Sequence, residues 1–260
     1  MKKSLLGSVA VSFIVLSPAF AADMPLKAPR PAPVAAAPNW TGIYFGANGG
    51  YGWGRADLTF PTAQFFADVA GQGYSQRPDG GIVGGHAGIN WQIGPWVIGE
   101  ETMIDWSRLD ETRIGGVSPT FPADIYSTRI SRYDSETARL GYAFGNFLFY
   151  AKGGVAWARW GLDLFSGPPI PNVAASYRQT VVGATGGGGI EYMVVPNLIL
   201  GIEYDYAAFK DRGIYAQGAC IGAGCAATLS APVTINATNT NISTVLGRVS
   251  YLINWGSLGF

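Results

Sequence analysis

A few residues in this sequence are of types that can do chemistry. His86 is the single histidine, and a serine hydrolase would use it as a general base beside a serine and an orienting acid. Glu203 and Asp205 form a close pair of carboxylates, of the kind that flanks a glycosidic bond in an open cleft. Each role requires particular neighbours, so the elements that carry these residues decide which role is possible.

The cysteines and one glycine run offer two further possibilities. Cys220 and Cys225 lie close together in a Gly/Ala-rich stretch, and in an oxidising compartment such a pair most simply forms a disulfide. A zinc site would need two more ligands, and none are nearby. The run Gly186 to Gly189 resembles a phosphate-binding loop, but the strand-like segment IEYMVV follows it and no Gly-Lys-Ser/Thr is present. We expect a smooth strand surface there.

The composition restricts the class of protein. Charged residues make up 13% of the 260 residues, about half of the ~25% found in soluble domains, whereas glycine and aromatic residues are abundant. The abundance of aromatic residues argues against disorder. Because the net charge is zero and no basic cluster is present, a nucleic-acid partner is not expected.

The first 21 residues are typical of a secretory signal peptide. Lys2 and Lys3 form a positive n-region, residues 5–16 an apolar h-region, and a small-x-small cleavage site ends at Ala21. The mature chain should therefore begin at Ala22. After the signal peptide, the sequence has no run of ~18 uncharged apolar residues, which is the length that a membrane-spanning helix requires. Only a closed β-barrel could therefore cross a membrane.

Residues 22–39 form a Pro/Ala-rich segment, which can neither pair into a sheet nor continue a helix past its prolines. We expect an extended periplasmic tail. It could be an inert spacer, or it could contact the cell wall through Lys27 and Arg30.

From Trp40 onward the sequence alternates apolar and small or polar residues, which is the period-2 pattern of β-strands. Three tight turns, at Gly94-Pro95, Gly145-Asn146 and Pro196-Asn197, recur every 51 residues. Long loops rich in Gly, Pro, Ser, Asp and Thr are expected at about 55–80, 107–132, 161–178 and 210–241. Three turns and four loops connect eight strands.

This arrangement predicts an all-β fold, an eight-stranded antiparallel transmembrane β-barrel over residues 40–260. Short turns on the periplasmic side and four long extracellular loops would place it in the cell outer membrane.

Strand parity predicts which charged side chains lie inside the barrel. An interior this narrow is filled by side chains, and desolvated charges must pair. We expect one ion network, built from Glu101, Arg139, Lys152, Glu191, Glu203, Asp205 and Arg248, with Asp105 nearby. The network could seal the barrel or gate a narrow pore. It leaves no room for a sugar, and the mid-strand, inward position of His86 argues against a catalytic role.

One strand poses a problem, because the adjacent Glu100 and Glu101 cannot share a face. We predict that Glu101 points inward, since this parity places Trp96, Ile98, Ile104 and Trp106 outside. Glu100 would then face lipid, or a bulge would redirect it.

Several segments together resemble a known family. These are NWTG-x-Y near the mature start, RLGYAF, and GGGG-I-EY. The chain resembles the small alphaproteobacterial outer-membrane β-barrel proteins, immunogenic surface proteins of the porin-family or opacity-like type, over essentially its whole length. The resemblance implies surface exposure and a role in envelope integrity, and it implies no catalytic residue. The cysteines and the tail WGSLGF depart from the family pattern.

We therefore expect a non-enzymatic structural barrel that supports the envelope and displays surface loops. The alternatives are a narrow porin for small solutes and a barrel-borne lipid-modifying enzyme. Expected partners are outer-membrane lipid and lipopolysaccharide, the barrel-insertion machinery and, through the tail, the cell wall. No cofactor and no metal are expected.

Overall fold

The computed structural model describes residues 38–168, 173–220 and 232–254. The expected signal peptide with its cleavage site at Ala21 and Ala22, most of the Pro/Ala-rich tail, and the WGSLGF terminus lie outside the described residues. The same holds for the side chain of Cys220 and for Cys225, so their disulfide stays a prediction.

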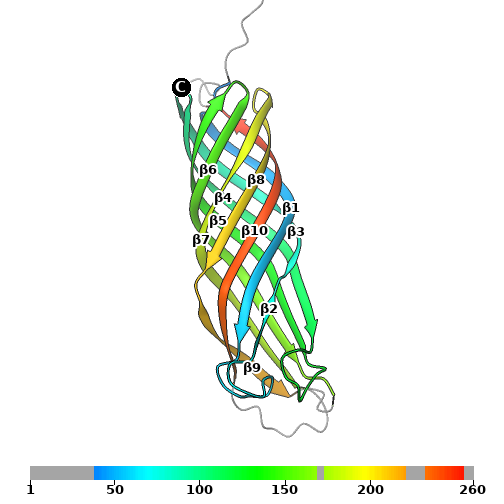
Figure 1. Ribbon diagram of the computed structural model, residues 1–260. Helices are drawn as coiled ribbons and strands as arrows, with labels where there is room; N and C mark the ends of the chain where they lie inside the picture. The colour runs from blue at the N-terminus through cyan, green and yellow to red at the C-terminus, as the bar shows by residue number, and fades with distance from the viewer. Residues whose placement is uncertain (1–37, 169–172, 221–231, 255–260) are drawn as a thin grey trace, which may run out of the picture. The chain divides into compact units, whose positions relative to one another are not determined.

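The described residues form one antiparallel sheet that closes into a barrel (Figure 1). Its ten strands are β1 (Gly42–Thr59), β2 (Gly73–Gln76), β3 (Asp79–Ile93), β4 (Trp96–Ile114), β5 (Ile125–Phe144), β6 (Phe147–Phe165), β7 (Val173–Val195), β8 (Leu198–Phe209), β9 (Arg212–Cys220) and β10 (Val233–Ile253). The sheet closes because β1 pairs with both β3 and β10. No helix in the described ranges is long and apolar enough to span a membrane.

The ten strands follow eight paths around the barrel. β2 and β3 pair with β1 in one continuous register, Tyr74 opposite Leu58 and Asp79 opposite Trp53, and are separated by Arg77 and Pro78. Likewise β8 and β9 pair with β10 in one register and are separated by Lys210 and Asp211. The predicted eight-stranded antiparallel barrel is confirmed, with two of its eight strands interrupted.

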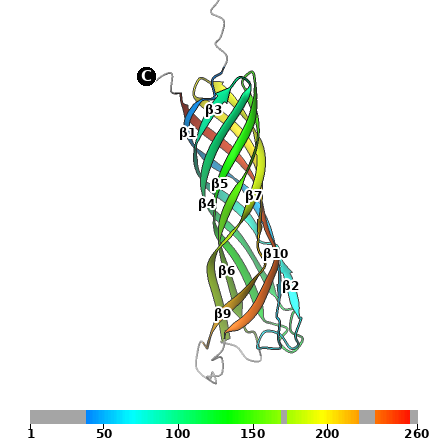
Figure 2. The same cartoon turned by 90° about the vertical axis from the view of Figure 1, so that its left-hand side faces the viewer.

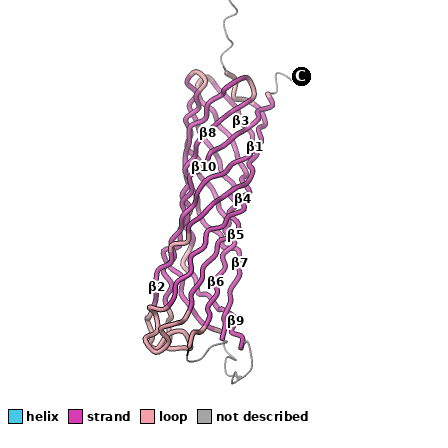
Figure 3. Tube along the Cα trace, turned by 90° about the vertical axis from the view of Figure 1, so that its right-hand side faces the viewer, coloured by secondary structure: helices cyan, strands magenta, loops and turns pink. Residues whose placement is uncertain are grey.

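Three tight turns lie together at one end, as predicted. Gly94 and Gly145 have φ angles of 60° and 56°, and Asn197 has a φ of 78°. This left-handed region is costly for most L-residues, and glycine and asparagine tolerate it best. Figure 3 shows these turns at one end of the barrel and the longer connections at the other.

The strands continue well past the predicted boundaries. Residues 107–114, 125–132, 161–165 and 173–178, which were expected in loops, all lie in strands, and Figure 2 shows the wall of the barrel continuing toward the end that carries β2 and β9. We therefore divide the barrel into a turn half (residues 43–53, 83–106, 134–157, 182–208 and 242–253) and a loop half (residues 54–82, 107–133, 158–168, 173–181, 209–220 and 232–241).

In the turn half, large apolar side chains cover the outer wall. Exposed members include Phe45, Trp53, Trp91, Trp96, Ile98, Ile104, Trp106, Tyr142, Phe149, Val182, Ile202, Tyr204 and Tyr251. From Trp96 to Trp106, ten steps of ~3.3 Å on a strand tilted by ~40° rise about 25 Å. This equals the height of the apolar band of outer-membrane barrels, which aromatic residues border on both sides.

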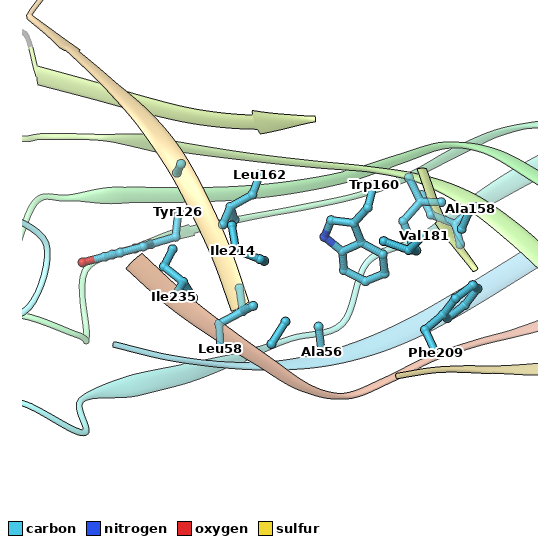
Figure 4. Close-up of a cluster of buried hydrophobic side chains, with 14 of the residues drawn as sticks. Ala56, Leu58, Tyr126, Ala158, Trp160, Leu162, Val181, Phe209, Ile214 and Ile235 are labelled. Carbon is cyan, nitrogen blue, oxygen red and sulfur yellow. The ribbon is translucent and has the colours of Figure 1, made fainter. Parts of the chain in front are cut away.

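In the loop half the polarity is reversed. The interior is an apolar cluster that includes Leu58, Tyr126, Trp160, Leu162, Ile214 and Ile235, none more than 1% exposed (Figure 4). The outer wall carries polar and charged residues, among them Arg55, Asp110, Thr112, Arg129 and Arg178.

Irregular pairing marks the boundary between the halves. The register shifts between Ile130 and Arg132 in β5, and Asn239 in β10 has a φ of 50° where that strand shifts against β1. A one-residue shift moves the following side chains to the other face. In β10, buried residues are therefore odd-numbered up to Ala237 and, apart from Ser243, even-numbered from Thr240 onward.

Candidate functional site

Seven charged side chains meet inside the turn half. They project from β4, β5, β6, β7, β8 and β10 because each occupies an inward position of the two-residue strand period. The residues are Glu101, Arg139, Lys152, Glu191, Glu203, Asp205 and Arg248, and none is more than 7% exposed. We call them the interior ion network.

Glu101 lies at the centre of the network. Its carboxylate oxygens lie 3.3 Å from Arg139 Nη1, 3.3 Å from Lys152 Nζ and 2.9 Å from Arg248 Nη1. The hydroxyl of Tyr44 donates to Oε2 at 2.9 Å. One carboxylate thus contacts all three cations of the network.

Arg139 connects Glu101 to the next strands. Its Nη2 lies 2.8 Å from Glu191 Oε2, and its Nη1 donates to the Tyr44 hydroxyl at 2.8 Å. The guanidinium also lies over the ring of Tyr150, 4.0 Å from the ring centroid, in a cation–π contact.

Lys152 and Arg248 surround the carboxylates of β8. Lys152 Nζ lies 2.7 Å from Glu203 Oε1 and 3.2 Å from Asp205 Oδ2. Arg248 pairs with Glu203 as well as with Glu101. The Tyr150 hydroxyl donates to Glu203 Oε2 at 2.5 Å. Each cation therefore bridges at least two carboxylates, as charges removed from water require.

Apolar layers lie on both sides of the network. On the turn side, one cluster fills the interior, consisting of Trp40, Tyr44, Val97, Leu148, Tyr150, Met193, Ile199 and Leu252. On the loop side the apolar cluster of Figure 4 begins. An ion travelling along the barrel axis would meet apolar side chains before and after the network.

Glu100 lies exposed on the outer wall, and Glu101 points inward. β4 keeps its register with β3 and β5 past both glutamates, since Glu100 faces Ile89 on one side and Ala138 on the other. The bulge alternative is therefore wrong for this position. The Glu100 carboxylate lies in the middle of the apolar band.

His86 has neighbours that reasoning from the sequence missed. Its Nε2 lies 2.7 Å from Ser250 Oγ, its Nδ1 lies 3.2 Å from Asn48 Oδ1, and Asn48 Nδ2 donates to Asp105 Oδ1 at 2.7 Å. Gly46 faces His86 on one side and Ser250 on the other. A Cβ at Gly46 would lie 2.6 Å from His86 Nε2, so only glycine lets the imidazole reach across β1. The inward parity of Asn48 and Ser250 was the signal available in the sequence.

A serine, a histidine and an amide in this order have the connectivity of a hydrolase triad. Ser250 is only 3% exposed, however, and points into the packed interior. A hollow of 350 Å³ on the outer wall touches His86, but Ser250 does not line it. A serine nucleophile must be reached by its substrate, and this hydroxyl is enclosed. The described residues contain no group of three or more His, Cys, Asp or Glu that could hold a metal ion.

Comparisons with known proteins agree on one family. Residues 30–247 match the family described as outer membrane protein beta-barrel domain. The chain is 31% identical to the 31 kDa outer-membrane immunogenic protein of Brucella melitensis, covering 82% of this chain and 90% of that one. It is 28% identical to the 22 kDa outer membrane protein of Rhizobium leguminosarum bv. viciae, covering 72% and 75%.

Among solved structures, the chain is similar to the outer membrane protein OprG of Pseudomonas aeruginosa, with a TM-score of 0.46 and 10% identity, covering 83% of this chain and 99% of that one. It is also similar to the outer membrane protease OmpT of Escherichia coli, with a TM-score of 0.48 and 10% identity, covering 82% and 97%.

Proposed function

The chain belongs to the outer membrane protein β-barrel domain family, and on this premise we propose that it is a non-enzymatic structural barrel that supports the envelope and displays an extracellular surface. The protein is located in the outer membrane, where the turn half meets lipid through its apolar band. The tight turns then face the periplasm, and the loop half extends outside the cell.

The packing of the interior is the observation that carries the proposal. Along the axis, an apolar layer is followed by the interior ion network and then by the apolar cluster of the loop half. A solute channel needs polar, hydrated walls, whereas Glu101, Lys152 and Glu203 have side chains at most 1% exposed. We infer that the ion network closes the barrel and joins its strands.

The enclosed Ser250 supports the non-enzymatic part of the proposal. Its hydrogen bond with His86, and that of His86 with Asn48, link β10, β3 and β1 where the barrel closes. We propose that this chain of hydrogen bonds holds the closing strands together and carries no lipid-modifying activity.

Partners follow from the same placement. Lipid surrounds the turn half. We propose that the barrel-insertion machinery inserts the mature chain, beginning at Ala22 after signal cleavage behind Ala21. The Pro/Ala-rich tail at residues 22–39 would lie in the periplasm, either as a spacer or in contact with the cell wall.

Single-channel recording of the purified, refolded protein in planar bilayers tests the proposal. We expect no discrete conductance steps from the wild-type barrel. Stable steps in the wild type would favour the alternative of a narrow porin. Glu101→Gln is the informative companion variant, because steps that arise only in this variant would mean that the intact network closes the path.

A further inference from the structure

A group of arginines lies on the outer wall just beyond the aromatic edge of the apolar band. Trp106 in β4 faces Arg132 in β5, Arg132 faces Arg159 in β6, and Arg159 faces Thr180 in β7. Two residues closer to the tight turns, the outer faces of the same four strands carry Ile104, Asp134, Trp157 and Val182. The arginines therefore lie at the height where lipid tails give way to headgroups of the outer leaflet.

The pairing of Arg132 with Arg159 is unfavourable without a further group. Like charges directly opposite each other on neighbouring strands destabilise a sheet. Asp134 lies 2.7 Å from Arg132 and offsets that charge. Arg159 has no ion pair within the described part of the chain and is exposed. The pair thus retains one positive charge without a protein partner.

The two arginines also share a hollow in the wall. A cavity of 290 Å³ is lined by Arg132, Asp134, Trp157, Arg159 and Thr180. Arginine recognises phosphate through paired N–H donors, and the threonine hydroxyl can donate a further hydrogen bond. A second hollow on β4 and β5 is lined by Arg108, Arg129 and Asp110. Because Asp110 lies 3.9 Å from Arg129, this hollow adds one net positive charge farther from the band.

From this geometry we propose that the hollow between β5, β6 and β7 binds a phosphate group on the headgroup of an outer-leaflet lipid. Arg159 and Arg132 hold the phosphate oxygens, and the indole of Trp157 lies against the junction of headgroup and acyl chains, where tryptophan is enriched in membrane proteins. The proposal rests on the outer-membrane location, and it does not depend on whether the interior conducts.

Native mass spectrometry of the detergent-solubilised protein tests the site. Three probes are titrated: lipid A with both phosphates, the same lipid after removal of its phosphates, and inorganic phosphate as a competitor. The test variant is R132Q/R159Q. The matched control is R55Q, which removes an outward arginine from the loop half of β1 that is 3.2 Å from Asp57. Far-UV circular dichroism checks that all proteins keep their β structure.

We expect the wild type to retain the phosphorylated lipid with an affinity about 25-fold higher than R132Q/R159Q, since each of the two arginines near a charged lipid surface contributes about fivefold. R55Q should match the wild type, and removal of the lipid phosphates should weaken wild-type binding as much as the double substitution does. Equal affinities of wild type and R132Q/R159Q would overturn the proposal. So would displacement of the lipid by millimolar inorganic phosphate, which would assign the hollow to a soluble anion.

Discussion

The turn half and the loop half of this barrel are built from the same strands with opposite polarity. In the turn half, Ile202 and Trp106 face outward while Glu101 and Lys152 are buried. In the loop half, Arg129 and Arg178 are exposed while Leu162 and Trp160 are buried. The solvent outside changes from lipid to water along the wall, and the side chains on both faces change with it.

The difference shows that the two halves are stabilised by different forces. In the loop half, burial of Trp160 and Leu162 removes apolar surface from water, which is the ordinary driving force of folding. In the turn half, the large apolar side chains face lipid and not the interior, so the packing of the interior depends more on the interior ion network, and the wall on ladder hydrogen bonds. Each half should therefore respond to its own kind of substitution.

The largest effect is expected in the network. Glu101→Gln leaves three buried cations with one negative charge fewer, and breaking a buried pair costs about 3 to 5 kcal/mol. Glu100→Gln is the matched control, because Glu100 is the preceding residue of β4 and its own carboxylate lies on the outer wall. Reversible unfolding in lipid vesicles should show a large loss of stability for the first variant and none for the second. Equal stability of both variants would mean that the network does not hold the turn half.

A truncation in the loop half should have a comparable or smaller effect, confined to that half. Leu162 is fully buried, and Leu→Ala substitutions in apolar cores cost about 2 to 5 kcal/mol. We expect Leu162→Ala to speed hydrogen exchange in residues 125–132 and 158–165 while residues 134–157 stay protected. Tyr215→Ala, at a 63% exposed position, serves as the control and should change little. Faster exchange throughout the barrel would show that the halves unfold as one unit.

A smaller effect is expected at the boundary, where Asp57 joins three strands. It accepts hydrogen bonds from Ser75 Oγ at 2.5 Å and from Asn239 Nδ2 at 2.9 Å. The hydrogen bond from Ser75, followed by those from Asn239 and Arg55, lowers the pKa of the Asp57 carboxyl below its ordinary value of 3.8.

Because this pKa is lower in the folded protein, the contribution of Asp57 is complete above the ordinary pKa and is lost as the pH falls below it. The contribution of Asp57 to the free energy of unfolding should be at most about 1 kcal/mol, since Asp57 and its partners are partly exposed. The protection factors of residues 73–76, which correct the exchange rates for the intrinsic effect of pH, should therefore fall in acid, and Asp57→Asn should show the lower protection already at neutral pH. Asp110→Asn, which loses only a 3.9 Å pair with Arg129, is the control. An identical acid response in Asp57→Asn and wild type would assign that response to another group.

The sequence was sufficient to predict the turn half because one rule holds along it. Apolar residues point outward at every second position, and this rule places Glu101, Arg139 and Lys152 inside. The loop half was missed for two reasons. Apolar residues move to the inner face, as at Leu58, and strands such as β10 change parity at Asn239, so the alternation no longer reads as one strand.

Individual contacts within the network could not be predicted either. Glu101 meets Arg248 across the interior, although the two lie 147 positions apart and on strands that do not pair. Which cation meets which carboxylate depends on the stagger of all eight strand paths. The contact between His86 and Ser250 likewise depends on Gly46 standing between them.

The reversal of polarity along one strand path is the central claim, and spin labels measure it directly. With Cys220 and Cys225 replaced by alanine, single cysteines at 202 and 215 place nitroxides on the outer wall of β8 and β9 in lipid vesicles. Ile202 is 57% and Tyr215 is 63% exposed, so neither label should disturb packing. We predict that the label at 202 collides with oxygen dissolved in lipid and the label at 215 with a water-soluble nickel complex. A label at 215 with the oxygen preference of 202 would contradict the account.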